Sequence, residues 1–296
     1  MRSKDFGVIP GLSKQFDTAL TLEMFRRVCL SRNFEMNVKI AADAGLIKYP
    51  IYLSLGKEAI SAALSVVYEK PDIFAQHRAH DTYICYGGNL IGLIDEILAR
   101  PTGIAKGMGG SASIHEPNIK MHGHSGLLGD QIPIAVGHCI GTNSRTLAIM
   151  GDAAAEEDYV LGALGFASHR KIPILFVCED NNLSLLTEKK IRRNWEISDV
   201  ARAFKMPSIE ITDDPWLVMH TVQELLKQKL PAFLQVHTCR VLWHAGTGID
   251  GPPEWDRFAM IKEEMAKLGL SEKAEKIEAE AKAYIDGLWE TQKAKK

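Results

Sequence analysis

The sequence predicts an α/β protein with a doubly wound, mostly parallel sheet and helical extensions at both ends. Two stretches carry this prediction. In the first, a buried-strand run at 146–150, a helix at 156–169 and a strand at 174–178 follow one another. This is the pattern of a right-handed crossover between parallel strands. In the second, strands at about 208–212 and 233–239 flank a helix at 215–228. Strands that alternate with helices build a parallel sheet covered on both faces.

The part of the chain before this crossover is predicted to be mainly helical. Leu22, Phe25 and Val28 repeat at three- and four-residue spacing, which is the period of an amphipathic helix that ends at Gly45. Pro101 ends another helix, because proline removes a backbone donor and clashes with the preceding turn. The expected elements are helices at 18–44, 56–68 and 90–100 and a short strand at 72–75.

Residues 103–130 differ from the rest, because they are dense in Gly, Ser and His and show little periodicity. A long loop inside a compact chain is usually functional. Interspersed apolar residues and a helix at about 131–142 favour a structured, functional loop. Two polar helices, 254–268 and 271–290, close the chain. We expect one domain over 1–296, with 254–296 as a helical C-terminal extension.

Composition excludes several classes of protein. The 296 residues are 46% hydrophobic and 24% charged, as in ordinary folded proteins. With 35 Lys+Arg against 37 Asp+Glu, the net charge of -2 gives no electrostatic basis for binding nucleic acid or an anionic membrane. No apolar run reaches the roughly 18 residues of a membrane span. Five scattered cysteines and an N-terminus without a signal-peptide pattern favour a cytoplasmic protein of enzyme size.

Two predicted strands end in polar groups that suit a metal ion. Asp152 follows the strand at 146–150, and Asn181 follows the strand at 174–178. Because ligands of open α/β sheets bind at the carboxyl ends of strands, we expect these side chains to converge. Carboxylate and amide oxygens suit Mg²⁺, and the start of the helix at 156–169 favours phosphate. Taken alone, the pattern also fits an ordinary turn and loop.

The stretch from Gly151 to Asn182 resembles the thiamine diphosphate motif, in which Gly-Asp-Gly is followed further along by Asn-Asn. Its details resemble the α subunit of 2-oxoacid dehydrogenase E1 components, a family that includes pyruvate, branched-chain 2-oxoacid and acetoin dehydrogenases. Further motifs in the family's order are GKEA at 56–59, HRAH at 77–80, AKGMGGS at 105–111, GLLGDQIP at 126–133, and Arg240 with His244. The resemblance covers residues 20–260 and implies the thiamine diphosphate-binding fold.

The resemblance implies roles at the matching positions. Asp152, Asn181 and the main-chain carbonyl of Leu183 would hold Mg²⁺. Arg78 would bind the diphosphate, for which its planar guanidinium offers paired hydrogen bonds. The implied cofactor-binding residues are His77, Arg78, Gly126, Leu128, Gly151, Ala153, Ala154, Leu183 and His244. Of the implied catalytic histidines, His244 would lie against the diphosphate and the reacting centre, His80 at the substrate entrance and His124 over the cofactor.

Two departures from the family leave questions open. Ala153 replaces the second Gly of Gly-Asp-Gly, which costs energy if that position needs a positive φ. The loop reads Asp-Asn-Asn at 180–182, so Asn182 remains an alternative metal ligand. His115, His122 and His124 could also suggest a transition metal, but this is disfavoured, because no carboxylate or cysteine completes a set.

The implied function is that of a thiamine diphosphate- and Mg²⁺-dependent 2-oxoacid dehydrogenase α subunit. It would decarboxylate a 2-oxoacid and pass the acyl unit to a lipoyl-bearing E2 or another acceptor. The family's cofactor-activating Glu belongs to the β subunit, so an α2β2 heterotetramer that is inactive as an isolated α chain is implied. Two alternatives stay open: a split transketolase-like or acyloin-forming carboligase subunit, and a scaffold subunit that has lost the cofactor. A dinucleotide-binding protein is disfavoured, because no G-x-G-x-x-G follows a strand.

Overall fold

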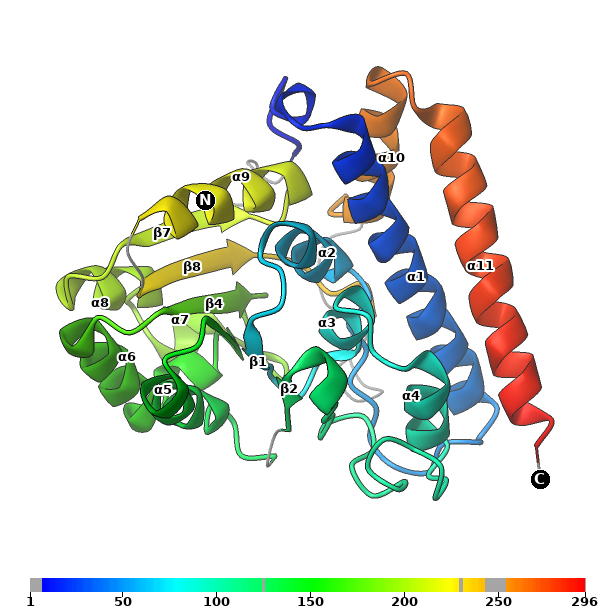
Figure 1. The fold of residues 1–296 in the computed structure, drawn as a ribbon, viewed down its shortest axis with the longest axis horizontal. Coiled ribbons are helices and arrows are strands. Elements are labelled where there is room, and N and C mark those ends of the chain that lie inside the picture. The colour runs from blue at the N-terminus through cyan, green and yellow to red at the C-terminus, as the bar shows by residue number, and fades with distance from the viewer. Residues whose placement is uncertain (1–6, 124–125, 229–230, 243–253, 296) are drawn as a thin grey trace.

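The computed structural model describes residues 7–123, 126–228, 231–242 and 254–295. Its centre is a six-stranded sheet with the order β2-β1-β3-β4-β8-β7, in which every neighbouring pair is parallel (Figure 1). The strands are β1 (Asp72–Phe74), β2 (Met121–His122), β3 (Thr146–Gly151), β4 (Ile174–Asp180), β7 (Ser208–Thr212) and β8 (Ala232–His237). A small antiparallel ribbon, β5 (Leu183–Ser184) and β6 (Thr187–Glu188), follows β4. The predicted α/β class is confirmed.

Helices cover both faces of this sheet. They are α1 (Thr18–Asp43), α2 (Glu58–Val67), α3 (His80–Cys85), α4 (Leu90–Ile97), α5 (Gln131–Thr142), α6 (Asp158–Arg170), α7 (Lys189–Arg192), α8 (Ile197–Ala203), α9 (Pro215–Lys227), α10 (Arg257–Lys267) and α11 (Ser271–Lys293). Side chains alternate between the faces of a strand. Leu147 and Ile149 therefore pack towards α2 and α9, whereas Ala148 and Met150 pack towards α5 and α6.

The two longest helices, α1 and α11, lie side by side at one end of the molecule (Figure 1). Phe34 of α1 contacts Trp289 of α11 with ring centroids 5.7 Å apart, and Asn37 donates a hydrogen bond to Asp286 at 2.7 Å. The side chain of Asp17 accepts the Ala19 amide and caps the start of α1. The C-terminal helices thus share a core with the N-terminal helix.

The structure corrects one expectation about the long loop at 103–130. Within it, β2 pairs in parallel with β1, so Ile73 lies opposite Met121 and Phe74 opposite His122. The loop therefore contributes an edge strand to the sheet. None of the helices in the described ranges is long and apolar enough to cross a membrane. All five cysteines are buried, and none of them forms a disulfide.

Candidate active site

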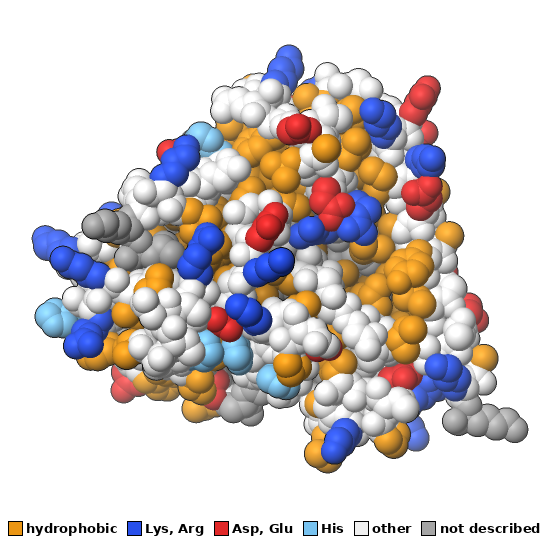
Figure 2. All heavy atoms as spheres, viewed as in Figure 1, with side chains coloured by type: hydrophobic (Ala, Val, Ile, Leu, Met, Phe, Trp, Pro, Cys, Tyr) orange, Lys and Arg blue, Asp and Glu red, His pale blue; other side chains and the backbone are white. Residues whose placement is uncertain are grey.

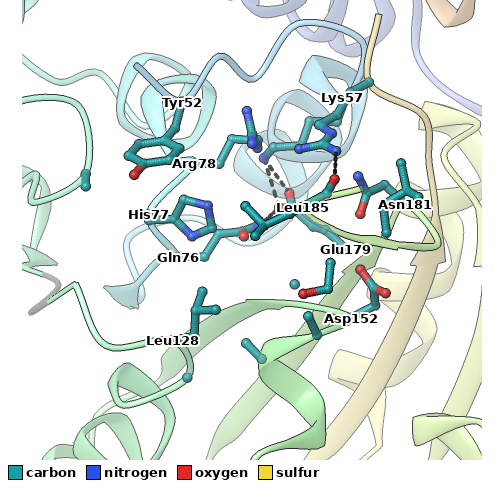
Figure 3. Close-up of a pocket in the computed structure, with 18 of the residues that line it drawn as sticks. Tyr52, Lys57, Gln76, His77, Arg78, Leu128, Asp152, Glu179, Asn181 and Leu185 are labelled. Carbon is teal, nitrogen blue, oxygen red and sulfur yellow. Dashed lines mark hydrogen bonds and ion pairs between the residues drawn. The ribbon is translucent and has the colours of Figure 1, made fainter. Parts of the chain in front are cut away.

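A cavity of about 360 Å³ opens at the carboxyl edge of the sheet. The ends of β3 and β4 contribute Gly151, Asp152, Glu179 and Asn181, because the carboxyl ends of parallel strands meet at one edge. Figure 3 shows Asp152 and Asn181 on one side of this pocket and Tyr52 and His77 on the other. Ten of the predicted site residues line it: His77, Arg78, Gly126, Leu128, Gly151, Asp152, Ala153, Ala154, Asn181 and Leu183.

Three oxygen-bearing groups converge at the β3–β4 side of the pocket. In the orientation that satisfies its hydrogen bonds, the Asn181 amide nitrogen lies 3.1 Å from Asp152 Oδ1 and 3.2 Å from the Leu183 carbonyl oxygen. A hydrogen-bond donor thus occupies the point towards which two acceptors are directed. With its amide turned over, Asn181 would add a third oxygen at the same point. Such an oxygen set fits Mg²⁺, whose other ligands are typically water and phosphate.

Two arginines border Asp152. Arg192 donates to its Oδ2 and also to Glu156, while Arg193 donates to the main-chain oxygen of Asp152 at 2.7 Å. Burial and the neighbouring charge of Asp180 raise the pKa of Asp152 to about 7, although both arginines act to lower it. A buried carboxyl group whose ionisation is this costly is a favourable partner for an added cation.

The neighbouring residues Asp180 and Asn182 point away from this convergence. Asp180 accepts hydrogen bonds from the Asn182 amide at 2.9 Å and from Lys189 Nζ at 2.6 Å. The Asn182 side chain is exposed, its φ is 65°, and it is not among the residues that line the pocket. Of the two candidate asparagines, Asn181 is the one beside Asp152.

A buried cluster of charges forms part of the pocket wall. Lys57, at the start of α2, lies 3.0 Å from Oδ2 of Asp81 and 2.8 Å from Oε2 of Glu179. Burial lowers the pKa of Lys57, but the two carboxylates outweigh it and raise that pKa overall. Burial raises the pKa of Glu179. Gln76 donates a further hydrogen bond to Glu179.

The opposite side of the pocket is aromatic and basic. The rings of Tyr52 and His77 meet edge to face at 4.8 Å, and the guanidinium carbon of Arg78 lies 6.0 Å from the Tyr52 ring centroid. Arg78 is buried apart from its pocket-facing surface, and it donates to the Leu53 carbonyl. Ala153 has a φ of -73°, an ordinary right-handed value, so glycine is not required at this position.

Of the three predicted catalytic histidines, the structure describes only His80, and it does not line the pocket. His80 is fully buried, with Nδ1 3.1 Å from Glu35 Oε1 and Nε2 2.9 Å from Ser111 Oγ. The expectation that His80 faces the substrate entrance is therefore wrong, because the start of α3 turns its side chain into the core. His124 and His244 lie outside the described residues.

Sequence reasoning missed three polar residues that line the pocket, Lys57, Gln76 and Glu179. It also missed Arg192, which pairs with Asp152 from outside the lining. A usable signal existed for two of them: Lys57 opens an otherwise apolar helix, and Glu179 ends an apolar strand. Charged residues at such positions are buried and need partners. The partner of each could not be read from the sequence, since Lys57 and Glu179 are 122 positions apart.

Comparison with known proteins identifies one family, the dehydrogenase E1 component. The family model described as dehydrogenase E1 component matches residues 26–247. The pyruvate dehydrogenase E1 component subunit alpha of Pisum sativum is 30% identical over 238 residues, which cover 76% of this chain and 59% of the relative. The corresponding subunit of Rickettsia bellii is 25% identical over 76% of this chain and 72% of its own length. The rice alpha-1 subunit is 29% identical, and the chain spans only 44% of its length.

Solved structures show the same fold at lower identity. A transketolase from Leishmania mexicana matches 94% of this chain and 46% of its own, with a TM-score of 0.59 and 16% sequence identity. A transketolase from Campylobacter jejuni matches with a TM-score of 0.58 and 12% identity.

Proposed function

The chain belongs to the dehydrogenase E1 component family, and from this premise we propose that it is the α subunit of a thiamine diphosphate- and Mg²⁺-dependent 2-oxoacid dehydrogenase. The observation that carries the proposal is the convergence of Asp152, Asn181 and the Leu183 carbonyl at one side of the pocket. Relatives of similar sequence are pyruvate dehydrogenase E1 α subunits, which supports a 2-oxoacid as substrate.

The pocket residues divide between the parts of such a cofactor. Asp152, Asn181 and Leu183 would hold Mg²⁺, with Gly151 beside them. Arg78, His77 and the main chain at Ala153 and Ala154 would hold the diphosphate, and the main chain at Gly126 and Leu128 the aminopyrimidine. Thiamine diphosphate supplies the nucleophilic carbon and the electron sink for decarboxylation of a 2-oxoacid. The roles of His244 and His124 in proton transfer stay predictions.

The chain's own residues organise this site. Arg193 donates to the Asp152 main-chain oxygen and fixes that residue, whereas Arg240 Nε donates to the Asn181 amide oxygen at 2.8 Å while the amide nitrogen faces Asp152, so turning the amide towards a metal would exchange this contact. Lys57 offsets part of the negative charge of Glu179 and Asp81, which reduces the repulsion between the pocket wall and a diphosphate. Side chains that are already held in place, such as Arg193 and Lys57, reduce the reorganisation of the site when a ligand binds.

We further propose that this chain works with an E1 β-like subunit in an α2β2 heterotetramer, possessing little activity alone, and that a lipoyl-bearing E2 accepts the acyl unit. Leu128 and Leu185 line the pocket, yet 39% and 60% of their surfaces are exposed, and Leu127 and Leu186 beside them are exposed as well. Exposed apolar side chains at the rim of a polar pocket are typical of a surface that a second protein chain covers. All five cysteines are free thiols, which is typical of proteins in the reducing cytoplasm and supports that location.

The test is to purify the chain together with the E1 β-like chain of its own genome and to supply thiamine diphosphate, Mg²⁺ and a series of 2-oxoacids. We expect release of CO₂ with reduction of an artificial electron acceptor, only when both chains are present. D152N should abolish this activity, and the surface variant R202Q should retain it. Carbon–carbon bond formation without an oxidant would instead establish a carboligase. Absence of Mg²⁺-dependent cofactor binding with the β chain present would establish a scaffold.

A further inference from the structure

A second cluster of metal-ligating side chains lies away from the pocket, beneath the edge strands of the sheet. Asp72 begins β1, His122 ends β2, and His138 projects from α5, which covers that face. One ligand atom from each of the three side chains lies within 4.8 Å of the others. None of the three lines the candidate active site.

The distances from each imidazole to the Asp72 carboxylate are close to those of a coordination sphere. His122 Nε2 lies 3.2 Å from Asp72 Oδ1, and His138 Nε2 lies 3.5 Å from Asp72 Oδ2. Zinc binds nitrogen and oxygen ligands at about 2.0–2.2 Å, which places two tetrahedral ligands about 3.4 Å apart. An ion could therefore enter the cluster with small side-chain movements.

Packing holds both imidazole rings in place. The His122 ring stacks on Phe74 at 4.5 Å, and the His138 ring lies 4.7 Å from His122 and 5.2 Å from Phe74. The sheet fixes His122 and Asp72 on one face, because Phe74 is opposite His122 and two residues from Asp72. Rings held in this way lose little freedom when they bind an ion.

The cluster contains a nitrogen atom that is available to bind a metal ion, and the cluster is accessible from solvent. The Nε2 atom of His138 is buried and has no close hydrogen-bond partner, and the nearest oxygen of Asp72 lies 3.5 Å from it. The side chains of His122 and His138 are nonetheless 32% and 24% exposed. Figure 2 shows histidine side chains gathered at the surface between the regions of α5 and β2.

We propose that Asp72, His122 and His138 form a second metal site that binds a divalent transition metal ion, with Zn²⁺ the best fit. Two imidazoles and one carboxylate favour such an ion over Mg²⁺ or Ca²⁺, which prefer oxygen ligands. Water would complete the sphere from the exposed side. The expectation that no carboxylate completes a set is therefore wrong for His122, because the fold supplies Asp72 from 50 positions earlier together with a histidine from α5.

The position of this site connects it to the pocket. His122 immediately precedes, and His138 follows, the segment 123–130 that supplies Gly126 and Leu128 to the pocket wall. An ion bound by both histidines ties the strand before that segment, β2, to the helix after it, α5, through β1. Its binding should therefore stabilise this wall of the pocket although none of its three ligands lines the pocket.

The test uses the full-length chain, freed of metal with a chelator and kept in millimolar Mg²⁺ so that the Asp152 site is satisfied. Co²⁺ is the probe, because its visible absorption reports nitrogen ligands and low coordination number. We expect one Co²⁺ per chain with this spectrum, displaced by Zn²⁺. H122Q and H138Q should each weaken binding by more than the roughly 10- to 100-fold that loss of an outer-shell partner costs.

Two matched variants separate this site from its neighbours. H115Q removes a histidine whose ring lies 6.5 Å from that of His122 but is outside the cluster, and it should leave Co²⁺ affinity unchanged. D152N should also leave it unchanged, because Asp152 belongs to the pocket. Circular dichroism confirms that each variant is folded, and D72N provides a third ligand variant. Unaltered affinity in folded H122Q and H138Q, no Co²⁺ binding, or loss of binding in D152N would overturn the proposal.

Discussion

The ammonium nitrogen of Lys57 lies 2.8 Å from Oε2 of Glu179, and both side chains are almost completely buried, with 3% and 2% of their surface exposed (Figure 3). The same ammonium group lies 3.0 Å from Oδ2 of Asp81, so one cation stands between two carboxylates. Ser61 donates a further hydrogen bond to Asp81 at 2.8 Å. The cluster joins the start of α2, α3 and the end of β4 beside the pocket.

Replacing Lys57 with methionine should therefore destabilise the chain strongly. The variant K57M leaves two buried carboxylates without their cation, and breaking a buried ion pair typically costs about 3–5 kcal/mol. K57Q should cost less, because an amide can still donate hydrogen bonds to one carboxylate. Urea denaturation of the full chain measures the free energy of unfolding. As a control, K276M removes a lysine that is 76% exposed and should shift it by no more than about 0.5 kcal/mol. Equal effects of K57M and K276M would contradict this interpretation.

The choice between the two adjacent asparagines can be decided by substitution. N181A should abolish Mg²⁺-dependent binding of thiamine diphosphate, because Asn181 lies beside Asp152 and the Leu183 carbonyl. N182G should preserve binding, since glycine suits the positive φ of 65° at that exposed position. Isothermal titration calorimetry of the complex with the β-like chain measures both. Loss of binding in N182G alone would assign the metal to Asn182.

Arg192 should oppose metal binding, because its guanidinium already pairs with Oδ2 of Asp152, the carboxylate that is expected to hold the cation, and with Glu156. In R192Q this competing charge is gone, and we expect Mg²⁺ to bind about 3- to 10-fold more tightly, or roughly 1 kcal/mol. R202Q is the control, since Arg202 forms an exposed pair with Asp199. Titration of Mg²⁺ at fixed thiamine diphosphate gives the affinity. Weaker Mg²⁺ binding in R192Q would show that Arg192 supports the site.

The sheet was accessible to prediction because its central strands are apolar on both faces. The runs at 146–150 and 174–178 stand out from their surroundings, and the observed β3 and β4 extend them by one and two residues. By contrast, β2 is two residues long and α3 is a fully buried helix of six residues, so neither contains a period that a sequence pattern could reveal. Contacts with the sheet and the core define these elements, since β2 pairs with β1 and every residue of α3 is buried.

The site residues that could be predicted are those that come directly after the central strands. Asp152 and Asn181 each come directly after a central strand, so the topology of the sheet brings them together. The partners of the buried charges could not be predicted, because Asp81 and Glu179 meet Lys57 from distant segments. His80 was misplaced for a related reason. The residue motif at 77–80 does not reveal that the helix beginning at His80 turns this side chain towards Glu35 and Ser111.

Glu58 should make stability depend on pH. It is buried at the start of α2, where Oε2 accepts the Gly56 amide at 2.8 Å, while Oε1 has no hydrogen-bond partner and lies 3.6 Å from Arg32. Burial raises its pKa to about 7 from the ordinary 4.5. Between these two pH values the folded chain binds a proton that the unfolded chain has lost. The free energy of unfolding therefore falls as pH rises through this window.

The variant E58Q tests this relationship, because glutamine has a similar shape and does not ionise. E58Q should gain stability relative to the parent chain as pH rises from 4.5 to 8, by up to about 3 kcal/mol, and should show no relative gain below pH 4.5. Loss of the attraction to Arg32 subtracts from this gain. The control E290Q removes a glutamate that is 73% exposed and should leave the pH profile unchanged. Urea denaturation at each pH supplies the comparison. A stability difference between E58Q and the parent chain that stays constant with pH would show that Glu58 remains ionised, with the charge of Arg32 offsetting the cost of its burial.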